Sequence, residues 1–198
     1  IYTAELLDIL DRNNVKATFF INGKNFQDIT KEPFRSYVLR MYNSGHHIAS
    51  HSYTHTSFIT LSSTGIKSEM DLNDQAIKSI IGVRPLYMRM PYGEYNDLVL
   101  STINNLGYKN ILWNIDSFDW ENQDTPSTFI QKNEASYDSS LVGTSPTTNS
   151  FISLQHDTIA LTVRQWAQYA INKMKAKGYT LVTVGDCNGQ STKSQWYR

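Results

Sequence analysis

The sequence predicts an α/β fold in which parallel strands alternate with helices. Stretches with apolar residues on one helical face alternate along the chain with short apolar runs that are rich in β-branched and aromatic residues. Gly45, Gly107 and Gly178 each follow a helical stretch and precede an apolar run, where an unhindered left-handed residue commonly ends a helix. No tandem repeat or linker interrupts this pattern, so we expect one domain over residues 1–198.

The first helix and strand have the clearest signals. Residues 2–13 place several leucine and isoleucine side chains near one face and end in an asparagine pair, which indicates a helix and its end. Residues 15–21 have the sequence VKATFFI, which is typical of a strand buried between helices. The same scheme predicts helices at 33–43, 62–81, 96–106, 126–137 and 161–177, and strands near His47, Tyr87, Ile111, Phe151 and Leu181. Residues 138–150 are rich in turn formers and predict a surface loop.

The balance of charged residues indicates which kinds of molecule the protein binds. The chain has 18 Lys plus Arg and 18 Asp plus Glu, so its formal net charge is zero. Such a chain has no global field that would attract nucleic acid or anionic lipid. No apolar run approaches the roughly 18 residues of a membrane span. We therefore expect a neutral partner, no nucleic acid, no membrane span and a monomeric protein.

Two histidines follow the strand expected near His47. His51 and His55 are four residues apart in HSYTHT, a spacing that lets two imidazoles converge on one metal ion if the segment is helical or tightly turned. Position 52 is Ser, where a zincin metalloprotease would carry Glu, so that class is disfavoured. The alternative is that the histidines satisfy local hydrogen bonds, and His46 and His47 fit this alternative better.

Polar residues also follow the next strand, in RMPYGEYND. Arg89 is always charged, Pro91 stiffens the turn, and backbone amides near Tyr92 could point into a cleft. The same residues could equally form an ordinary turn between a strand and a helix. Because catalytic groups of parallel α/β folds gather where strands end, the segment is a candidate site.

Two later segments complete the set of polar strand ends. WNIDSFDW presents Asp116, Asp119 and Trp120, which could supply a carboxylate partner and a ring that stacks on sugar, or could form an Asx-turn beside a buried Trp. FISLQHD places His156 just past an apolar strand that contains Leu154, in a position suited to general acid or base catalysis. A lone His in such a place is more often structural, but four polar strand ends in succession favour an enzyme.

In order, HSYTHT, RMPY, DSFDW and LQH resemble the second to fifth motifs of the NodB-type polysaccharide deacetylases, a family of carbohydrate esterases, and the match spans nearly the whole chain. The segments GHHIASHSYTHT, HDTIALTV and VGDCNGQ resemble fungal chitin deacetylases in particular. The resemblance implies a distorted (β/α) barrel. It also implies that His51 and His55 are two ligands of a divalent ion, zinc or cobalt.

The family's first motif, TFDDGP, is absent from this sequence. In the family it supplies the third metal ligand and the catalytic base, and it lies just before the helix expected at residues 2–13. The resemblance therefore implies an amino-terminally truncated domain that lacks the first barrel strand. It also implies that these 198 residues alone have little activity.

The resemblance assigns a role to each remaining candidate residue. Metal-activated water would attack the acetamide carbonyl, and the backbone amide of Tyr92 would help to hold the resulting oxyanion. His156 would protonate the departing amine, with Asp119 orienting its ring, while Arg89 would orient the base. Trp120 and Leu154 would line the site around the acetyl methyl group, and the role of Asp116 stays open.

The resemblance implies hydrolysis of the N-acetyl groups of chitin or chitooligosaccharides, which gives chitosan and acetate, by a secreted or cell-wall enzyme. Two alternatives remain. The chain could be an inactive sugar-binding remnant that retains the barrel, or a deacetylase of peptidoglycan or xylan, because substrate choice depends on variable loops and not on the shared motifs.

Overall fold

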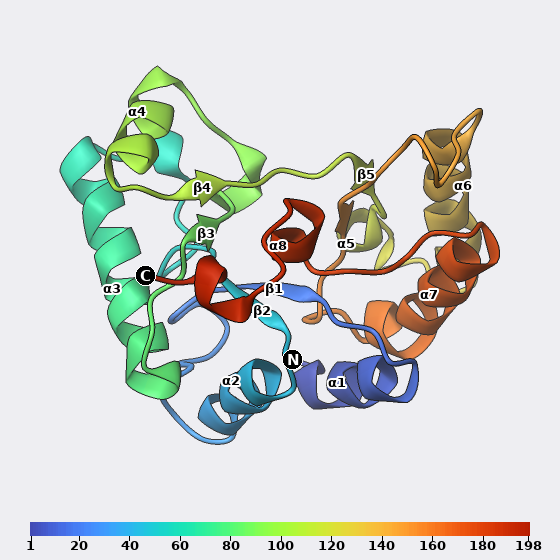
Figure 1. The fold of residues 1–198 in the computed structure, drawn as a ribbon, viewed down its shortest axis with the longest axis horizontal. Coiled ribbons are helices and arrows are strands. Elements are labelled where there is room, and N and C mark those ends of the chain that lie inside the picture. Colours follow the sequence, from blue (N-terminus) through green and yellow to red (C-terminus); the bar gives the residue numbers. More distant parts are fainter. The chain divides into compact units, whose positions relative to one another are not determined.

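The computed structural model describes residues 1–198 and divides into two compact units. Unit 1 comprises residues 1–16 and 113–182, and unit 2 comprises residues 17–112 and 183–198. Figure 1 shows the helices and strands of both units. None of the helices has the length and apolar character needed to cross a membrane.

Unit 2 is built on a parallel sheet of four short strands. These are β1 (Thr18–Ile21), β2 (His47–Ser50), β3 (Tyr87–Met88) and β4 (Lys109–Asn110), and their order in the sheet is β1-β2-β3-β4. Strands β1 and β2 pair from Thr18 opposite His47 to Ile21 opposite Ser50. All four residues of β2 are buried, as expected for a strand inside a parallel sheet.

Helices connect successive strands of this sheet. They are α2 (Phe34–Asn43), α3 (Ser63–Ile81) and α4 (Asp97–Asn105). Ser62 caps α3 by accepting the Gly65 N–H, and Gly82 ends it with a left-handed φ of 81°. One apolar cluster joins α3 and α4 to the sheet, and its buried members are Phe58, Ile66, Met70, Met88, Met90, Val99, Ile103 and Tyr108.

The last residues of the chain complete unit 2 around His47. A short helix, α8 (Val184–Cys187), and a 3₁₀ turn (Lys193–Trp196) follow one another there. The N–H of Gly185 donates to His47 Nδ1 at 3.3 Å. The Trp196 ring stacks on the same imidazole, with ring centroids 4.7 Å apart. Gly185 has no room for a side chain, because an added Cβ would lie 2.1 Å from Trp196 Nε1.

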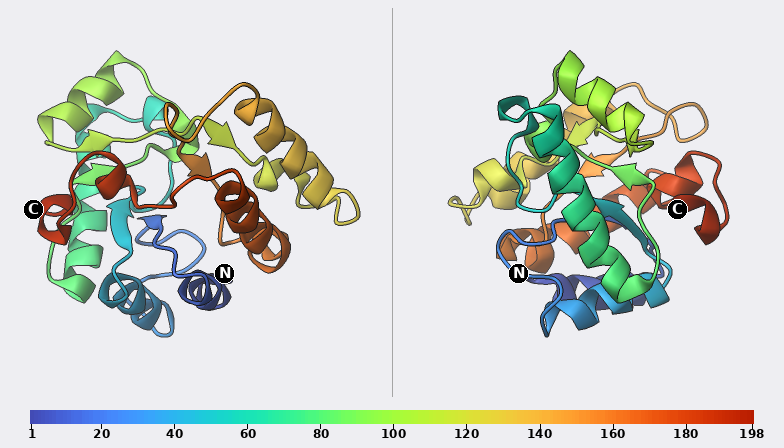
Figure 2. Two further views of the ribbon diagram at one scale, coloured as in Figure 1. Left: turned by 45° about the vertical axis from the view of Figure 1, so that its right-hand side comes forward. Right: turned by 90° about the vertical axis from the view of Figure 1, so that its left-hand side faces the viewer.

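Unit 1 pairs two short parallel strands with a group of helices. The strands are β5 (Ile115–Asp116) and β6 (Ser153–Leu154), and the helices are α1 (Thr3–Arg12), α5 (Asp119–Asn122), α6 (Phe129–Leu141) and α7 (Ala167–Ala176), the last preceded by a π-helical turn (Thr162–Trp166). Helices α6 and α7 lie side by side (Figure 2), and Lys173 joins them through ion pairs with Glu134 at 2.9 Å and Asp138 at 2.8 Å. One apolar cluster of this unit has the buried members Ile115, Phe129, Tyr137, Leu141, Trp166, Ala170 and Met174.

The expected α/β class is confirmed, since the strands of each sheet are parallel and helices follow them. Gly45, Gly107 and Gly178 have the expected left-handed φ of 83°, 77° and 86°. The expected strand at Leu181 is wrong, because residues 178–183 form no strand and lead directly into α8. The strand expected near Ile111 is two strands, β4 and β5. Helix α6 continues to Leu141 and shortens the loop expected from position 138.

Candidate metal-binding and acid–base residues

The ring nitrogens of His51 and His55 meet in unit 2. Their Nε2 atoms are 3.2 Å apart and their ring centroids 4.8 Å. Two nitrogen ligands of a tetrahedral zinc ion, each about 2.0–2.1 Å from the metal, are themselves about 3.4 Å apart. The pair therefore fits two corners of such a site. No group of three or more His, Cys, Asp or Glu side chains in the described chain gathers in an arrangement that could hold a metal ion.

The tautomer of His51 suits it as a metal ligand. Its Nδ1 lies 2.8 Å from the backbone carbonyl oxygen of Arg89. A carbonyl only accepts, so Nδ1 carries the proton and donates, which leaves the lone pair of a neutral ring on Nε2. Metal-binding histidines commonly have such a partner on the second ring nitrogen.

The turn between the two histidines has an unusual backbone. Ser52 and His55 have left-handed φ of 67° and 65°, a conformation that residues with side chains seldom adopt. The Ser52 hydroxyl oxygen accepts the His55 N–H at 3.0 Å. The Asn22 side chain donates to the carbonyl oxygens of His51 and, at 3.2 Å, Ser52. The convergence of the rings thus arises from a tight turn and not from a helix.

Arg89 and Tyr92 lie in the same unit. The Arg89 side chain is buried, its guanidinium lies 4.0 Å from the centre of the Phe20 ring, and its Nε donates to the Ile111 carbonyl at 3.2 Å. Tyr92 is exposed, with its ring centroid 4.6 Å from that of His55 and a left-handed φ of 61°. The first two of the four polar strand ends therefore meet, since β2 and β3 are adjacent in the sheet.

A second cluster forms in unit 1 around the buried carboxylate of Asp119. His156 Nδ1 lies 2.8 Å from Asp119 Oδ1, and the His156 N–H donates to Oδ2 at 2.7 Å. The Thr162 hydroxyl and the Trp120 N–H also donate to this carboxylate, at 2.8 and 2.9 Å. Since a carboxylate only accepts, His156 Nδ1 carries a proton, and the ring presents its Nε2 from a side chain that is 38% exposed.

The other candidates of unit 1 surround this pair. Trp120 is about half exposed and Leu154 is buried in β6. The Asp116 carboxylate accepts the Phe118 N–H at 2.8 Å and the Trp113 indole N–H at 3.1 Å. The Asx-turn alternative therefore holds for Asp116, whose carboxylate makes these local hydrogen bonds and none to His156.

The other two histidines in this region are structural. His46 Nδ1 accepts the Ala17 N–H at 3.1 Å. His47 is fully buried beneath Trp196, and its Nδ1 accepts from Gly185. Burial lowers the pKa of His47 to about 4, and the nearby Asp186 carboxylate offsets only part of this effect. Both rings fit the expectation of buried, hydrogen-bonded histidines.

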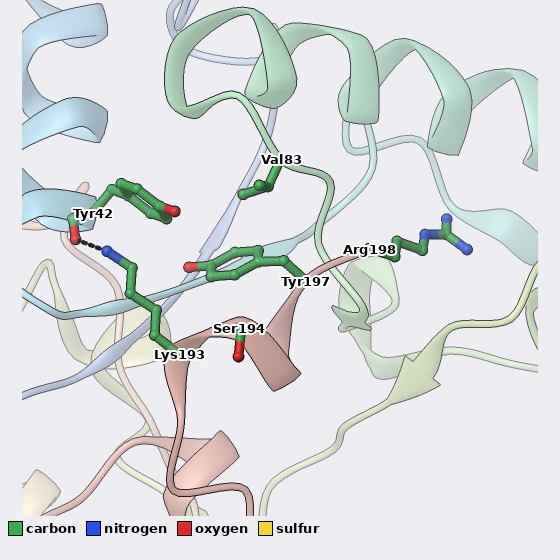
Figure 3. A pocket seen from close by; sticks show the side chains of 6 residues that line it. All are labelled: Tyr42, Val83, Lys193, Ser194, Tyr197 and Arg198. Carbon is green, nitrogen blue, oxygen red and sulfur yellow. Dashed lines mark hydrogen bonds between the residues drawn. The ribbon is translucent and has the colours of Figure 1, made fainter.

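A separate pocket of about 380 Å³ lies elsewhere in unit 2 (Figure 3). Its lining residues are Tyr42, Val83, Lys193, Ser194, Tyr197 and Arg198. The Lys193 ammonium lies 3.2 Å from the centre of the Tyr42 ring. None of the residues singled out in the sequence lines this pocket.

Comparison with known proteins gives the family. The polysaccharide deacetylase profile matches residues 1–111, more than half of the chain. The chain is 43% identical to a chitin deacetylase of Pestalotiopsis sp., covering 100% of the chain and 62% of that protein. It is 41% identical to a probable peptidoglycan-N-acetylglucosamine deacetylase of Arthroderma benhamiae, covering 100% of the chain and 43% of that protein. The chain thus spans less than two thirds of either relative.

The fold matches that of a solved relative. The chitin deacetylase of Colletotrichum lindemuthianum superposes with a TM-score of 0.93 at 36% sequence identity, covering 100% of this chain and 86% of that one. The α/β fold expected from the motifs is therefore that of a known deacetylase structure. The chain belongs to the polysaccharide deacetylase family.

Three residues that are not among the candidates of the sequence hold the candidate side chains in place. Thr162 binds the Asp119 carboxylate, Asn22 binds the histidine turn, and Glu69 accepts hydrogen bonds from Tyr53 and Thr54 in the same turn. Thr162 lies in HDTIALTV, one of the segments that resemble fungal chitin deacetylases, whereas Asn22 and Glu69 belong to no recognisable motif. Only the folded structure brings them to the site.

Proposed function

We propose that the protein hydrolyses the N-acetyl groups of N-acetylglucosamine residues in chitin or chitooligosaccharides, giving chitosan and acetate. The proposal is supported by membership of the family and by the names of the Pestalotiopsis and Colletotrichum relatives. The observation that carries it is the 3.2 Å separation of the Nε2 atoms of His51 and His55. Such a pair suits metal-assisted hydrolysis of an amide.

A divalent ion, zinc or cobalt, is part of this proposal. His51 and His55 would hold it through their Nε2 atoms, and the Arg89 carbonyl keeps the His51 ring in the required tautomer. A bound ion of this kind polarises a carbonyl oxygen and lowers the pKa of water. We assign the Tyr92 backbone amide to the developing oxyanion and the Arg89 side chain to orientation of the catalytic base, as in the family motif.

The proton for the departing amine would come from His156. Its Nδ1 is held by Asp119, so Nε2 is the atom that delivers the proton. A protonated imidazole next to a buried carboxylate stays correctly oriented because the Nδ1–H has an acceptor that cannot donate. Trp120 and Leu154 would contact the acetyl group and the sugar through apolar surface.

A second candidate substrate is peptidoglycan. The Arthroderma relative, 41% identical over the whole chain, is named a probable peptidoglycan-N-acetylglucosamine deacetylase. Both polymers carry the same N-acetylglucosamine unit, so the residues described here would serve either. The choice between them depends on contacts outside the acetyl group.

Acetate release by the full-length protein tests the proposal. The substrates are chitin oligomers, peptidoglycan fragments and acetylated xylan, each assayed before and after chelation and after addition of zinc or cobalt. We expect release from chitin oligomers that chelation abolishes and metal restores, and that the His51→Ala and His55→Ala variants lack. Acetate release that does not depend on metal would refute the proposed activity. Release from peptidoglycan or xylan alone would refute the proposed substrate.

We also propose a secreted or cell-wall location and a monomeric state. A polymer of the cell wall is reached only outside the membrane, which supports the location. Cell fractionation tests the location, and light scattering of the purified protein tests the monomer.

A further inference from the structure

We infer that Glu69 is a positioning residue for the two histidines: its carboxylate holds the turn between His51 and His55 in the conformation that brings their Nε2 atoms together. The inference rests on the proposed function, because it gives the turn the task of placing two metal ligands. The hydrogen bonds of Glu69 go to the backbone of Tyr53 and Thr54 and to the Thr54 hydroxyl, so it would act on the rings through the backbone.

The turn needs an external support. Two of its residues, Ser52 and His55, have left-handed backbones that carry a conformational cost for residues with side chains. Such a conformation persists only where the surroundings hold it. If the turn relaxed, the two rings would separate, because the left-handed Ser52 lies between them and His55 itself is left-handed.

Glu69 provides this support from α3. Its Oε2 accepts the N–H groups of Tyr53 and Thr54 at 2.9 and 2.7 Å, and its Oε1 accepts the Thr54 hydroxyl at 2.9 Å. These three bonds all go to the two residues between Ser52 and His55. An ionised acceptor makes stronger hydrogen bonds than a neutral one, and two backbone N–H groups on one oxygen fix the direction of the chain.

The other backbone contacts of the turn use its carbonyl groups and the His55 N–H, and they leave the N–H groups of Tyr53 and Thr54 to Glu69. Asn22 binds the carbonyl groups of His51 and Ser52, and the Ser52 hydroxyl binds the His55 N–H. The Tyr53 carbonyl accepts the Lys24 N–H at 2.7 Å. The N–H groups of Tyr53 and Thr54 point the other way, toward α3, where the Glu69 carboxylate receives both.

The same face of α3 also fixes the strand end that precedes the turn. Asn73, one helical turn after Glu69, donates to the Ser50 hydroxyl at 2.7 Å and to the Ile21 carbonyl at 2.9 Å. Helix α3 therefore makes hydrogen bonds to the chain on both sides of His51, to Ser50 before it and to Tyr53 and Thr54 after it. Asn73 sets where β2 ends, and Glu69 sets the path from that end to His55.

The test compares Glu69→Ala and Glu69→Gln with Asp71→Asn. Asp71 lies on the same helix and pairs with Lys67, so its variant controls for the loss of a carboxylate from α3. Cobalt titration of the full-length protein, followed by the visible absorption of the bound ion, gives the dissociation constant. Amide hydrogen exchange at Tyr53 and Thr54 reports the hydrogen bonds without any metal.

For Glu69→Ala we expect faster exchange at both amides and a cobalt dissociation constant raised about 10-fold. Glu69→Gln should show a smaller change, because its amide oxygen still accepts the two N–H groups, and Asp71→Asn should match the wild type. Faster exchange with an unchanged dissociation constant would overturn the inference and reduce Glu69 to a structural role. A wild type that binds no cobalt would instead refute the proposed function itself.

Discussion

The Asp119 carboxylate holds both the ring and the backbone of His156. Its Oδ1 lies 2.8 Å from His156 Nδ1, and its Oδ2 accepts the His156 N–H at 2.7 Å. Rotation of the ring would therefore break its bond to this buried acceptor, while the second bond holds the backbone of His156 in place. The carboxylate fixes the tautomer and the direction of Nε2 in a single contact.

We expect Asp119→Asn to lower the rate of acetate release by about 10²–10⁴, because the amide NH₂ cannot accept and the His156 tautomer loses its partner. The variant should also be less stable by about 1–3 kcal/mol, since four donors share this buried carboxylate. Asp116→Asn is the matched control, as Asp116 does not contact His156. Equal activity of the two variants would refute the positioning role.

Substrates with different leaving groups can distinguish the role of His156 from that of His51. We expect His156→Gln to lose most of its activity on chitin oligomers, yet to retain activity on an aryl acetate, whose phenolate leaves without a proton. His51→Gln should lose activity on both, together with cobalt binding. The measurements are initial rates on each substrate and cobalt absorption. Equal losses of His156→Gln on both substrates would contradict its role as the acid.

Stability should fall with acid because of His47. Its pKa is lowered by burial to about 4 from an ordinary value of 6.5, so between these values the unfolded chain binds more protons than the folded one. The contribution of His47 to the free energy of unfolding is complete above pH 6.5. It decreases as the pH falls toward 4, by up to about 3 kcal/mol.

The variant His47→Asn isolates this effect, because its side-chain oxygen can still accept the Gly185 N–H but does not titrate. We expect a flatter dependence of the free energy of unfolding on pH between 6.5 and 4, measured by urea denaturation. The same slope in both proteins would assign the acid sensitivity to other groups.

Gly185 should not tolerate a side chain. In Gly185→Ala the new Cβ would meet the Trp196 indole at 2.1–2.6 Å, so the ring or α8 must shift. We expect a loss of about 1–3 kcal/mol, measured by urea denaturation. Gly65→Ala in the first turn of α3 is the control, because its Cβ would come no closer than 3.3 Å to Leu61, and it should have little effect. Similar stability of the two variants would mean that Trp196 is loosely held.

The sequence predicts the helices well because their signals are local. Apolar periodicity and the glycines at 45, 107 and 178 locate the helix ends to within a few residues. It does less well for strands of two residues, such as β4 and β5, where pairing with a neighbour defines the element and no local pattern does. The apolar run at Leu181 has the composition of a strand but no partner there.

For the site, the sequence predicts the candidate metal-binding and acid–base residues, but it does not predict the residues that hold them in position. The spacing of His51 and His55 permits convergence, and the tight turn achieves it. Glu69 lies on a helix with other charged residues and is indistinguishable there from a solvent-facing Glu. Its partners are 15 and 16 residues away, and Asp119 lies 37 residues from His156, so only the fold relates them.

The discontinuous units set an order for synthesis on the ribosome. All residues of unit 1 have been made once the ribosome has added residue 182. Unit 2 is then still incomplete, because it also contains residues 183–198. The Gly185 partner of His47 is made 138 residues after it. Until Trp196 is made, the His47 imidazole lacks the indole that stacks on it. Contacts between residues so far apart in sequence form slowly, so a nascent chain would expose this face of the sheet longest and depend most on chaperones there.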